Sequence, residues 1–197
     1  MNMIYKEQLS FGFFETHSSQ PKYPNLHHVQ QVHGTNIVKL PNTKNTSEIQ
    51  GDGLYYDLGT KTYKLAILTA DCMPVVILGK QGHAFIHAGW QGLSRGIFKT
   101  KEIQEIKPYF FFIGPHIQQR SYEVKADFKK NFPHSRNFMD IQGKLHFSLK
   151  GEAIDQIHKI YPLSFVESSN ICTYEDKHFH SYRRDKTEKR NWNIFMT

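Results

Sequence analysis

Residues 65–92, LAILTADCMPVVILGKQGHAFIHAGWQG, decide the fold class because they contain long apolar runs in quick succession. Two of these runs end in a residue that binds metals or attacks carbonyl groups. Cys72 follows Asp71 at the end of LAILTA, and His87 ends AFIH. A buried strand is apolar along its length, so reactive groups placed at strand ends are expected to face a pocket. We therefore expect a functional site here.

The segments on either side predict more strands than helices. Apolar runs predict strands at residues 65–70, 75–78, 84–87 and 109–114. Residues 27–40 are typical of a strand pair bent at Gly34, and GDGLYYD, residues 51–57, of a turn entering a short strand. The strands cluster without a helix after each one. This order indicates an α+β fold with mixed or antiparallel pairing, as a single layered domain flanked by helices.

Three segments have apolar residues at mostly helical intervals. They predict helices over residues 93–106, with Ser94 near the start, over 121–132, ended by Pro133, and over 148–160. Together with the strands, these helices fill a chain of 197 residues and 23.1 kDa. That length suits one domain, residues 1–197, with its own apolar core.

The net charge is +7 and the isoelectric point is about 9.3, which favours an anionic partner. The basic residues are scattered, however, and the sequence has no recognisable nucleic-acid reader motif, so we do not expect nucleic acid as the partner. Only two cysteines occur, and the N-terminus has neither a signal peptide nor an apolar anchor. A reducing, cytoplasmic location with no membrane association is therefore expected. Whether the protein is a monomer or a homodimer stays open.

A third residue, His33, resembles Cys72 and His87 in its setting, because it follows an apolar residue and precedes a glycine. One thiolate and two imidazoles suit zinc, and three protein ligands leave the fourth tetrahedral position open for water or substrate. The residues alone also fit a small buried cysteine and two hydrogen-bonded turn histidines. Spacing does not decide between these readings.

Five motifs bear on this choice: QVHGTNIV, TADCMPVVIL, HAGWQGLSRGIF, GPHIQQRSYEV and CTYEDKHFHSYRRD. In order and approximate spacing they resemble the bacterial multicopper polyphenol oxidase family, also called the laccase-domain family. The resemblance covers most of residues 30–190. It implies a layered α+β fold with a mixed central sheet, similar to the catalytic domain of cytotoxic necrotising factor toxins.

The resemblance also implies an activity and a metal. Members are understood as zinc-dependent purine nucleoside phosphorylases that also deaminate adenosine, so adenosine, inosine or methylthioadenosine, together with phosphate, are the expected substrates. The implied zinc ligands are His33, Cys72 and His87. Copper is less favoured, because a multicopper laccase needs many histidines around several copper ions, and the sequence shows no such array.

The chain departs from the family pattern in three places. Residues 11–20 read FGFFETHSSQ where the family commonly has Thr-Arg followed by glycines, Gln91 replaces the arginine of GWRG, and residues 118–121 replace Gly-Pro-Cys-Cys. These changes concern substrate and phosphate contacts and leave the three implied ligands in place.

Four more residues are candidates for the site. Asp71, next to Cys72, is the candidate proton-transfer group, but adjacent residues on an extended chain point to opposite faces, which slightly favours a role in capping the turn. Arg183 or Arg184, in SYRRD, would bind phosphate oxygens through the guanidinium group unless this segment is a solvated strand or hairpin. Tyr122 would contact the base or ribose unless it is a half-buried core residue.

Three alternatives remain. Cys72 as a thiolate nucleophile and His87 as its base would give a metal-free hydrolase of the amidase or deamidase type. A basic binding module with an inactive pocket is the second. The third is an additional metal cluster of Cys172, His178 and His180, which we interpret as an incidental grouping.

Overall fold

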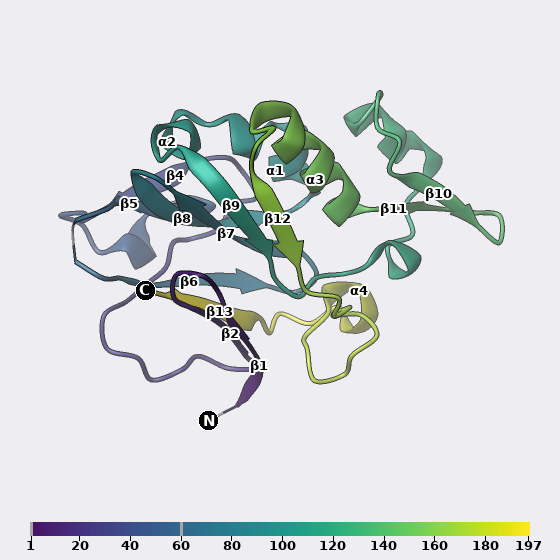
Figure 1. Ribbon diagram of the computed structural model, residues 1–197. Helices are drawn as coiled ribbons and strands as arrows, with labels where there is room; N and C mark the ends of the chain where they lie inside the picture. The colour runs from purple at the N-terminus through teal and green to yellow at the C-terminus, as the bar shows by residue number, and fades with distance from the viewer. Residues whose placement is uncertain (1, 60) are drawn as a thin grey trace.

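A six-stranded sheet lies at the centre of the computed structural model, which describes residues 2–59 and 61–197 (Figure 1). Its strands, in spatial order, are β12 (Phe165–Ser168), β9 (Pro108–Ile113), β7 (Met73–Gly79), β8 (Gly82–Ala88), β5 (Gly53–Asp57) and β4 (Ile37–Leu40). β7 is antiparallel to β8 and β9, whereas β12 is parallel to β9 and β4 to β5. The predicted α+β fold with mixed sheets is confirmed.

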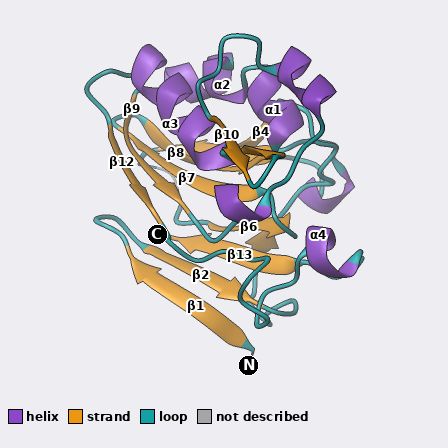
Figure 2. Ribbon diagram, turned by 90° about the vertical axis from the view of Figure 1, so that its right-hand side faces the viewer, coloured by secondary structure: helices purple, strands orange, loops and turns teal. Residues whose placement is uncertain are grey.

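A second sheet packs against one face of the first. Its five strands, in spatial order, are β1 (Met3–Gln8), β2 (Phe13–His17), β13 (Asn191–Met196), β6 (Lys64–Thr69) and β3 (Leu26–His27). β13 pairs with both β2 and β6, so segments from the two ends of the chain lie side by side. Figure 2 shows the two sheets stacked, with most of the helices on the far side of the six-stranded sheet.

The remaining elements are short. The helices are α1 (Trp90–Ser94), α2 (Lys101–Glu105), α3 (Leu149–Ile160) and α4 (Tyr182–Asp185), and a separate hairpin is formed by β10 (Phe138–Ile141) and β11 (Lys144–Phe147). Short segments of 3-10 helix occur at Thr46–Glu48, Ile97–Lys99, Gln119–Ser121 and Ala126–Asn131.

Within the described residues, no helix is both long and apolar enough to cross a membrane.

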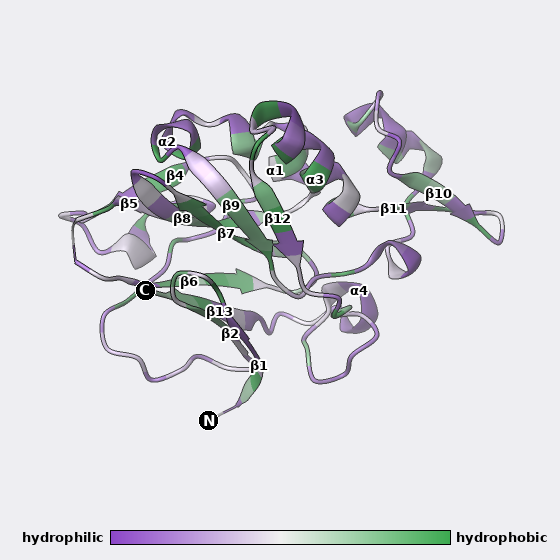
Figure 3. Cartoon of the chain, viewed as in Figure 1, coloured by the Kyte–Doolittle hydropathy of each residue, from purple (hydrophilic) through white to green (hydrophobic). Residues whose placement is uncertain are grey.

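Strand β7 is buried on both faces, which explains its unbroken apolar sequence. Val75 and Ile77 belong to the core that the six-stranded sheet forms with the helices, whereas Val76 and Leu78 belong to the core between the two sheets. Successive side chains of a strand point to opposite faces, so a central strand in a three-layer fold needs apolar residues at every position. Figure 3 shows the hydrophobic colour along β6, β7 and β8.

The predicted strands 65–70, 75–78, 84–87 and 109–114 correspond to β6, β7, β8 and β9, and residues 51–57 contain β5 as expected. The helix predicted over 148–160 is also confirmed. Ser148 caps α3 by accepting a hydrogen bond from the Gly151 N–H at 2.9 Å, and Leu149, Ala153 and Ile157 are buried.

The helix predicted over 93–106 is interrupted. The chain forms α1, a 3-10 turn and α2, separated at Gly96, whose φ of +77° is left-handed. Ser94 lies at the end of α1, where its hydroxyl donates to the Gln91 carbonyl, rather than at a helix start. The apolar stripe still reaches the core, because Ile97 and Ile103 are buried. Helical spacing therefore predicted the buried face but not the continuity of the helix.

The helix predicted over 121–132 is wrong. Only Ala126–Asn131 is helical, as a 3-10 segment, and Glu123 forms an isolated bridge with His146 instead. Phe128 and Phe132 pack on Phe147, with ring centroids 5.3 and 4.8 Å apart. Burial of these rings against the β10–β11 hairpin replaces the helical hydrogen bonds that the spacing implied.

The strand pair predicted over 27–40 is also wrong in its pairing. β3 joins the five-stranded sheet and β4 the six-stranded sheet, so the two strands belong to different layers. The expected bend near Gly34 is present, and His33 adopts a left-handed φ of +58° there. This turn carries the chain from one layer to the other.

His83, in β8, is buried without a well-formed hydrogen bond to either ring nitrogen in the described part of the chain. Its ring lies among Phe11, Tyr56 and Phe195, at centroid distances of 4.9, 5.7 and 6.4 Å. Burial lowers the pKa of His83, and the backbone of Gly82 offsets this only in part. Burial therefore favours the neutral form of His83 in the folded protein.

We expect His83→Phe to remove part of the acid sensitivity of the fold. The unfolded chain binds a proton at His83 near pH 6.5, whereas burial lowers the pKa of His83 in the folded chain, so stability falls as the pH falls below that value. Between pH 7.5 and 5.5 the variant should lose about 1 kcal/mol less free energy of unfolding than the wild type, as measured by urea denaturation. His134→Phe, at an exposed position, is the control. Equal losses in all three proteins would contradict the interpretation.

Candidate metal centre

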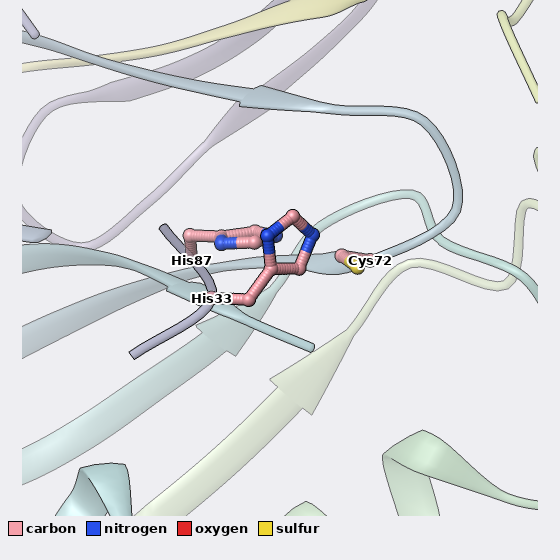
Figure 4. Close-up of side chains that lie close together, drawn as sticks. All are labelled: His33, Cys72 and His87. Carbon is pink, nitrogen blue, oxygen red and sulfur yellow. The ribbon is translucent and has the colours of Figure 1, made fainter. Parts of the chain in front are cut away.

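Three side chains from two turns and one strand converge at one end of the sheets. Cys72 lies in the turn between β6 and β7, His87 near the end of β8, and His33 in the turn between β3 and β4. The donor atoms of the three lie within 4.8 Å of one another. Figure 4 shows their side chains directed toward a common point. The structure thus brings together the three residues singled out in the sequence.

Antiparallel pairing of β7 and β8 explains part of this convergence. Pro74 stands opposite His87, so the turn that carries Cys72 lies next to the end of β8. The rings of His33 and His87 are 4.8 Å apart at 82°. His87 is 3% exposed, Cys72 is half-buried and His33 is exposed, so the centre opens to solvent on the His33 side.

The charges of this group are strongly coupled. Burial raises the pKa of the Cys72 thiol, but the positive charge of His87 and hydrogen bonds from His33 and His87 outweigh this and lower it. Burial lowers the pKa of His87, but the negative charge of Cys72 and the hydrogen bond to Asp52 outweigh this and raise it. The sulfur is therefore favoured as a thiolate, the form that binds metals and attacks carbon.

Asp52 connects the ring of His87 to the backbone of His33, and the sequence analysis did not identify it. Its Oδ1 accepts hydrogen bonds from His87 Nδ1 and from the His33 backbone N–H, both at 2.9 Å, and its Oδ2 accepts from the Gly34 N–H at 2.6 Å. The carboxylate is fully buried. Because Nδ1 of His87 donates to Asp52, Nε2 remains as the donor for a metal, an arrangement that fixes the ring and raises its basicity.

The only sequence signal for Asp52 is a charged residue between two glycines directly before an apolar strand. That pattern is also typical of an ordinary turn. Its role becomes visible only when the β3–β4 turn folds over it.

Gly89 makes room for the sulfur. A Cβ atom at this position would lie 2.9 Å from Cys72 Sγ and 3.7 Å from His33 Cδ2. The φ of Gly89, −88°, is accessible to any residue. Glycine is therefore needed at this position because Cys72 lies so close, and not because of the backbone conformation.

The donor set fits a transition metal. Two imidazoles and one thiolate are ligands that zinc prefers at about 2.0–2.3 Å, and they leave one position open. Two histidines and one cysteine also occur in copper sites, so the donor set alone does not name the metal. Among residues 2–59 and 61–197, His33, Cys72 and His87 form the single group of at least three such side chains close enough to share an ion.

The three residues line a cavity of about 770 Å³. Trp90, Tyr122, Ile117 and Leu149 contribute aromatic and apolar surface to it. This volume lies within the range of about 300–1,000 Å³ found for small-molecule sites. The candidate metal centre therefore faces a space large enough for an aromatic ligand.

Asp71 also lines this cavity, but both of its carboxylate oxygens are engaged. Oδ1 accepts from Thr173 Oγ1 at 2.8 Å, and Oδ2 accepts from the Arg183 N–H at 2.7 Å. Asp71 has a φ of +93° and its carbonyl accepts from the Ile117 N–H. Its carboxylate thus attaches the start of α4 to the turn that carries Cys72.

The two arginines of SYRRD differ in position. Arg183 lines the cavity, stacks over Tyr122 at 5.1 Å and donates from Nη1 to the Glu123 carbonyl at 2.6 Å. Arg184 is not among the lining residues. Its guanidinium donates to backbone carbonyls, which include those of Thr173 at 2.9 Å and Phe179 at 2.7 Å, and pairs with Asp185. The solvated strand or hairpin considered for this segment is replaced by α4.

Cys172, His178 and His180 do not converge. Cys172 Sγ accepts from the Gln118 N–H at 3.4 Å, His178 Nδ1 contacts Asp176 at 2.9 Å, and His180 Nε2 donates to the Ser18 carbonyl at 2.8 Å. Each residue is engaged by a different segment, so their proximity in sequence does not make a common site.

Comparison with known proteins places the whole fold in a described group. A family model described as multi-copper polyphenol oxidoreductase laccase matches residues 14–196. A protein of Aquifex aeolicus (strain VF5) named purine nucleoside phosphorylase is 34% identical over 167 residues, which cover 81% of this chain and 77% of that protein. Shigella flexneri purine nucleoside phosphorylase YfiH is 32% identical over 178 residues, 82% of this chain and 70% of the relative.

Solved structures have the same architecture. A crystal structure of a Neisseria meningitidis protein superimposes with a TM-score of 0.74 at 27% identity, over 87% of this chain and 74% of that one. Bacillus licheniformis YfiH, at 23% identity, superimposes with a TM-score of 0.70 over 87% of this chain and 73% of that one, and supports the fold alone.

We expect Asp52→Asn to weaken zinc binding by about 10- to 100-fold, although no ligand is changed. The two carboxylate oxygens of Asp52 accept hydrogen bonds from four N–H groups, whereas an asparagine amide has one acceptor oxygen. Either His87 or the turn that carries His33 therefore loses a hydrogen bond. Competition with a chromogenic chelator measures the affinity. Asp140→Asn, in the exposed β10–β11 hairpin, is the control, and unchanged affinity in folded Asp52→Asn would refute the role.

Gly89→Ala should destabilise the metal-free protein by about 1–3 kcal/mol, because the added methyl group overlaps Cys72 Sγ. The same substitution in a Cys72→Ala background should cost much less, since the sulfur is gone. Urea denaturation of the four proteins of this cycle gives the coupling free energy. A coupling near zero would show that the glycine serves some other purpose.

Proposed function

The chain belongs to the multi-copper polyphenol oxidoreductase laccase family, and we propose that it is a zinc-dependent purine nucleoside phosphorylase. Its proposed substrates are adenosine, inosine or methylthioadenosine, with phosphate as co-substrate. The observation that carries the proposal is the convergence of His33, Cys72 and His87 on one cavity. The names of relatives at 32–34% identity support the reaction class.

The three converging residues would hold the zinc ion. When bound there, zinc supplies a Lewis acid and a template for substrate oxygens. Zinc is preferred over copper because one His₂Cys group cannot assemble the several copper ions that laccase chemistry needs, and the described residues contain one such group. The oxidase name of the family is therefore not carried over as an activity of this chain.

The cavity supplies what phosphorolysis needs from the protein. Phosphate must lie beside the ribose C1′ atom, and the purine must be stabilised as it leaves with negative charge. Trp90 and Tyr122 offer aromatic faces for the base, and Arg183, stacked over Tyr122, offers guanidinium N–H groups for phosphate.

Adenosine deamination is proposed as a second activity of the same cavity. It requires a proton-transfer group near C6 of the base. Asp71 is the carboxylate among the lining residues, but its bonds to Thr173 and Arg183 hold both oxygens. Asp71 therefore acts mainly as a positioning residue, and phosphorolysis is the activity that we propose as dominant.

One observation favours a second candidate function, a cysteine hydrolase. Cys72, His87 and Asp52 form a nucleophile, base and orienting carboxylate in the order found in catalytic triads, with Asp52 fixing His87 Nδ1 at 2.9 Å. His33 separates the two functions, because it is a ligand in the zinc enzyme and dispensable in the hydrolase.

We expect the purified protein to contain about one zinc ion per chain and to release hypoxanthine from inosine only when phosphate is present. His33→Ala should lose the metal and reduce the rate by at least about 100-fold. His178→Ala, an exposed histidine outside the cavity, is the control. Metal analysis and a phosphate-dependent assay with inosine, adenosine and methylthioadenosine measure both effects.

Alkylation of the thiol distinguishes the two candidates. In the zinc enzyme, iodoacetamide should modify Cys72 slowly in the wild type and faster in His33→Ala, because bound metal protects the sulfur. In a metal-free hydrolase, loss of the hydrogen bond from His33 should leave the alkylation of Cys72 as fast or make it slower. A wild type without zinc that shows this result would overturn the zinc phosphorylase and favour the hydrolase.

A further inference from the structure

The cavity beside the metal centre has one strongly cationic wall. Arg183, Lys186 and Arg190 line it. Among the lining residues that the structure describes, Asp71 is the single acidic one, and its oxygens already accept hydrogen bonds from Thr173 and the Arg183 backbone. The other polar groups that line it include neutral glutamines such as Gln91. The wall therefore attracts an anion.

None of the three cations forms an ion pair with a described carboxylate; Glu123, whose pKa is lowered mainly by Lys144 and to a smaller extent by Arg183, is paired with Lys144. Across residues 2–59 and 61–197, no carboxylate lies within ion-pair distance of any of them, whereas their neighbour Arg184 pairs with Asp185 at 2.8 Å. Arg190 Nη1 donates to the carbonyls of Thr187 and Lys189 at 3.0 and 2.9 Å. A guanidinium group has five N–H donors, so Arg183 and Arg190 both retain donors for a ligand.

All three cations stand on one short segment, residues 182–190, which is fixed at both ends. The His180 N–H donates to Asn191 Oδ1, and Asn191 Nδ2 donates to the His180 carbonyl, both at 2.8 Å. Arg184 holds the segment from inside through the carbonyls of Thr173 and Phe179. A segment held in this way loses little freedom when a ligand binds, which favours affinity.

The side chains on this segment suit a phosphoryl group. Guanidinium groups bind the oxygens of phosphate in a bidentate manner, and an ammonium group acts as a point charge beside them. Lys186 Nζ lies over the Tyr182 ring at 5.1 Å and Arg183 over Tyr122 at 5.1 Å, so both heads are supported by rings that line the cavity. A phosphoryl group carries close to two negative charges and three acceptor oxygens. Three unpaired cations match it better than they match a single carboxylate.

We propose that Arg183, Lys186 and Arg190 form a phosphoryl-binding subsite on the wall of the metal cavity. The assignment of inorganic phosphate as its occupant rests on the proposed phosphorylase function. The same subsite accepts the 5′-phosphate of a purine nucleotide if the natural substrate is a nucleotide instead, because both ligands present the same oxyanion.

Single variants Lys186→Gln and Arg190→Gln test the subsite, with Lys189→Gln as the matched control. Lys189 lies on the same segment, is exposed, and is not among the residues that line the cavity. Each of the first two variants should raise the KM for phosphate on the order of 10-fold, with the KM for inosine and the zinc content unchanged. Lys189→Gln should behave as the wild type. Thermal unfolding confirms that each variant is folded.

Calorimetric titration with inorganic phosphate and with inosine 5′-monophosphate gives a readout that needs no turnover. The subsite is supported if the wild type binds either ligand and if this binding is weakened on the order of 10-fold in Lys186→Gln and Arg190→Gln but not in Lys189→Gln. The ligand that binds shows whether the subsite takes inorganic phosphate or the phosphate of a nucleotide. If the wild type releases no purine but this pattern of binding holds, the phosphorylase fails and the subsite stands. If phosphate and the nucleotide bind the wild type and all variants equally, or bind none of them, the subsite is refuted whether or not inosine is cleaved.

Discussion

The site depends on one buried carboxylate. Asp52 accepts hydrogen bonds from a ring nitrogen of His87 and from the backbone of the turn that carries His33. A buried charge is stable only when its hydrogen-bonding capacity is satisfied, and these donors satisfy it. The same bonds that stabilise Asp52 hold His33 in a left-handed conformation that a histidine seldom adopts. One interaction therefore fixes two of the three candidate ligands.

The layered core gives this carboxylate a rigid support. β7 and β8 are buried on both faces, between the helices and the five-stranded sheet, so their ends have little freedom. Cys72 and His87 stand at those ends, where the apolar sequence stops. The cations proposed to bind phosphate come instead from α4 and the segment that follows it. Two of the three candidate ligands thus stand at the ends of core strands, whereas the proposed phosphate contacts lie on a loop that side-chain bonds hold in place.

Sequence patterns succeeded where burial was two-sided and failed where packing was local. The runs that became β6 to β9 are apolar at consecutive positions, which only a central strand requires over so short a length. Residues 93–106 and 121–132 have helical spacing as well, yet Gly96 interrupts the first and a cluster of phenylalanine rings around Phe147 reshapes the second. The spacing of apolar residues indicates which residues are buried. A segment whose helix is interrupted can bury the same residues as a continuous helix.

The sequence by itself determined the α+β class and the central strands, because strand burial depends on residue type at consecutive positions. It also singled out Cys72, His87 and His33 as candidate ligands, through their places at the ends of apolar runs and through five motifs that resemble a known family. The tertiary structure alone identified Asp52, separated Arg183 from Arg184, and gathered Arg183, Lys186 and Arg190 on one cavity wall. Adjacent arginines have the same chemistry in a sequence. Only the folded loop decides which guanidinium group meets backbone carbonyls and which faces the cavity, since that choice depends on contacts between segments far apart in the chain.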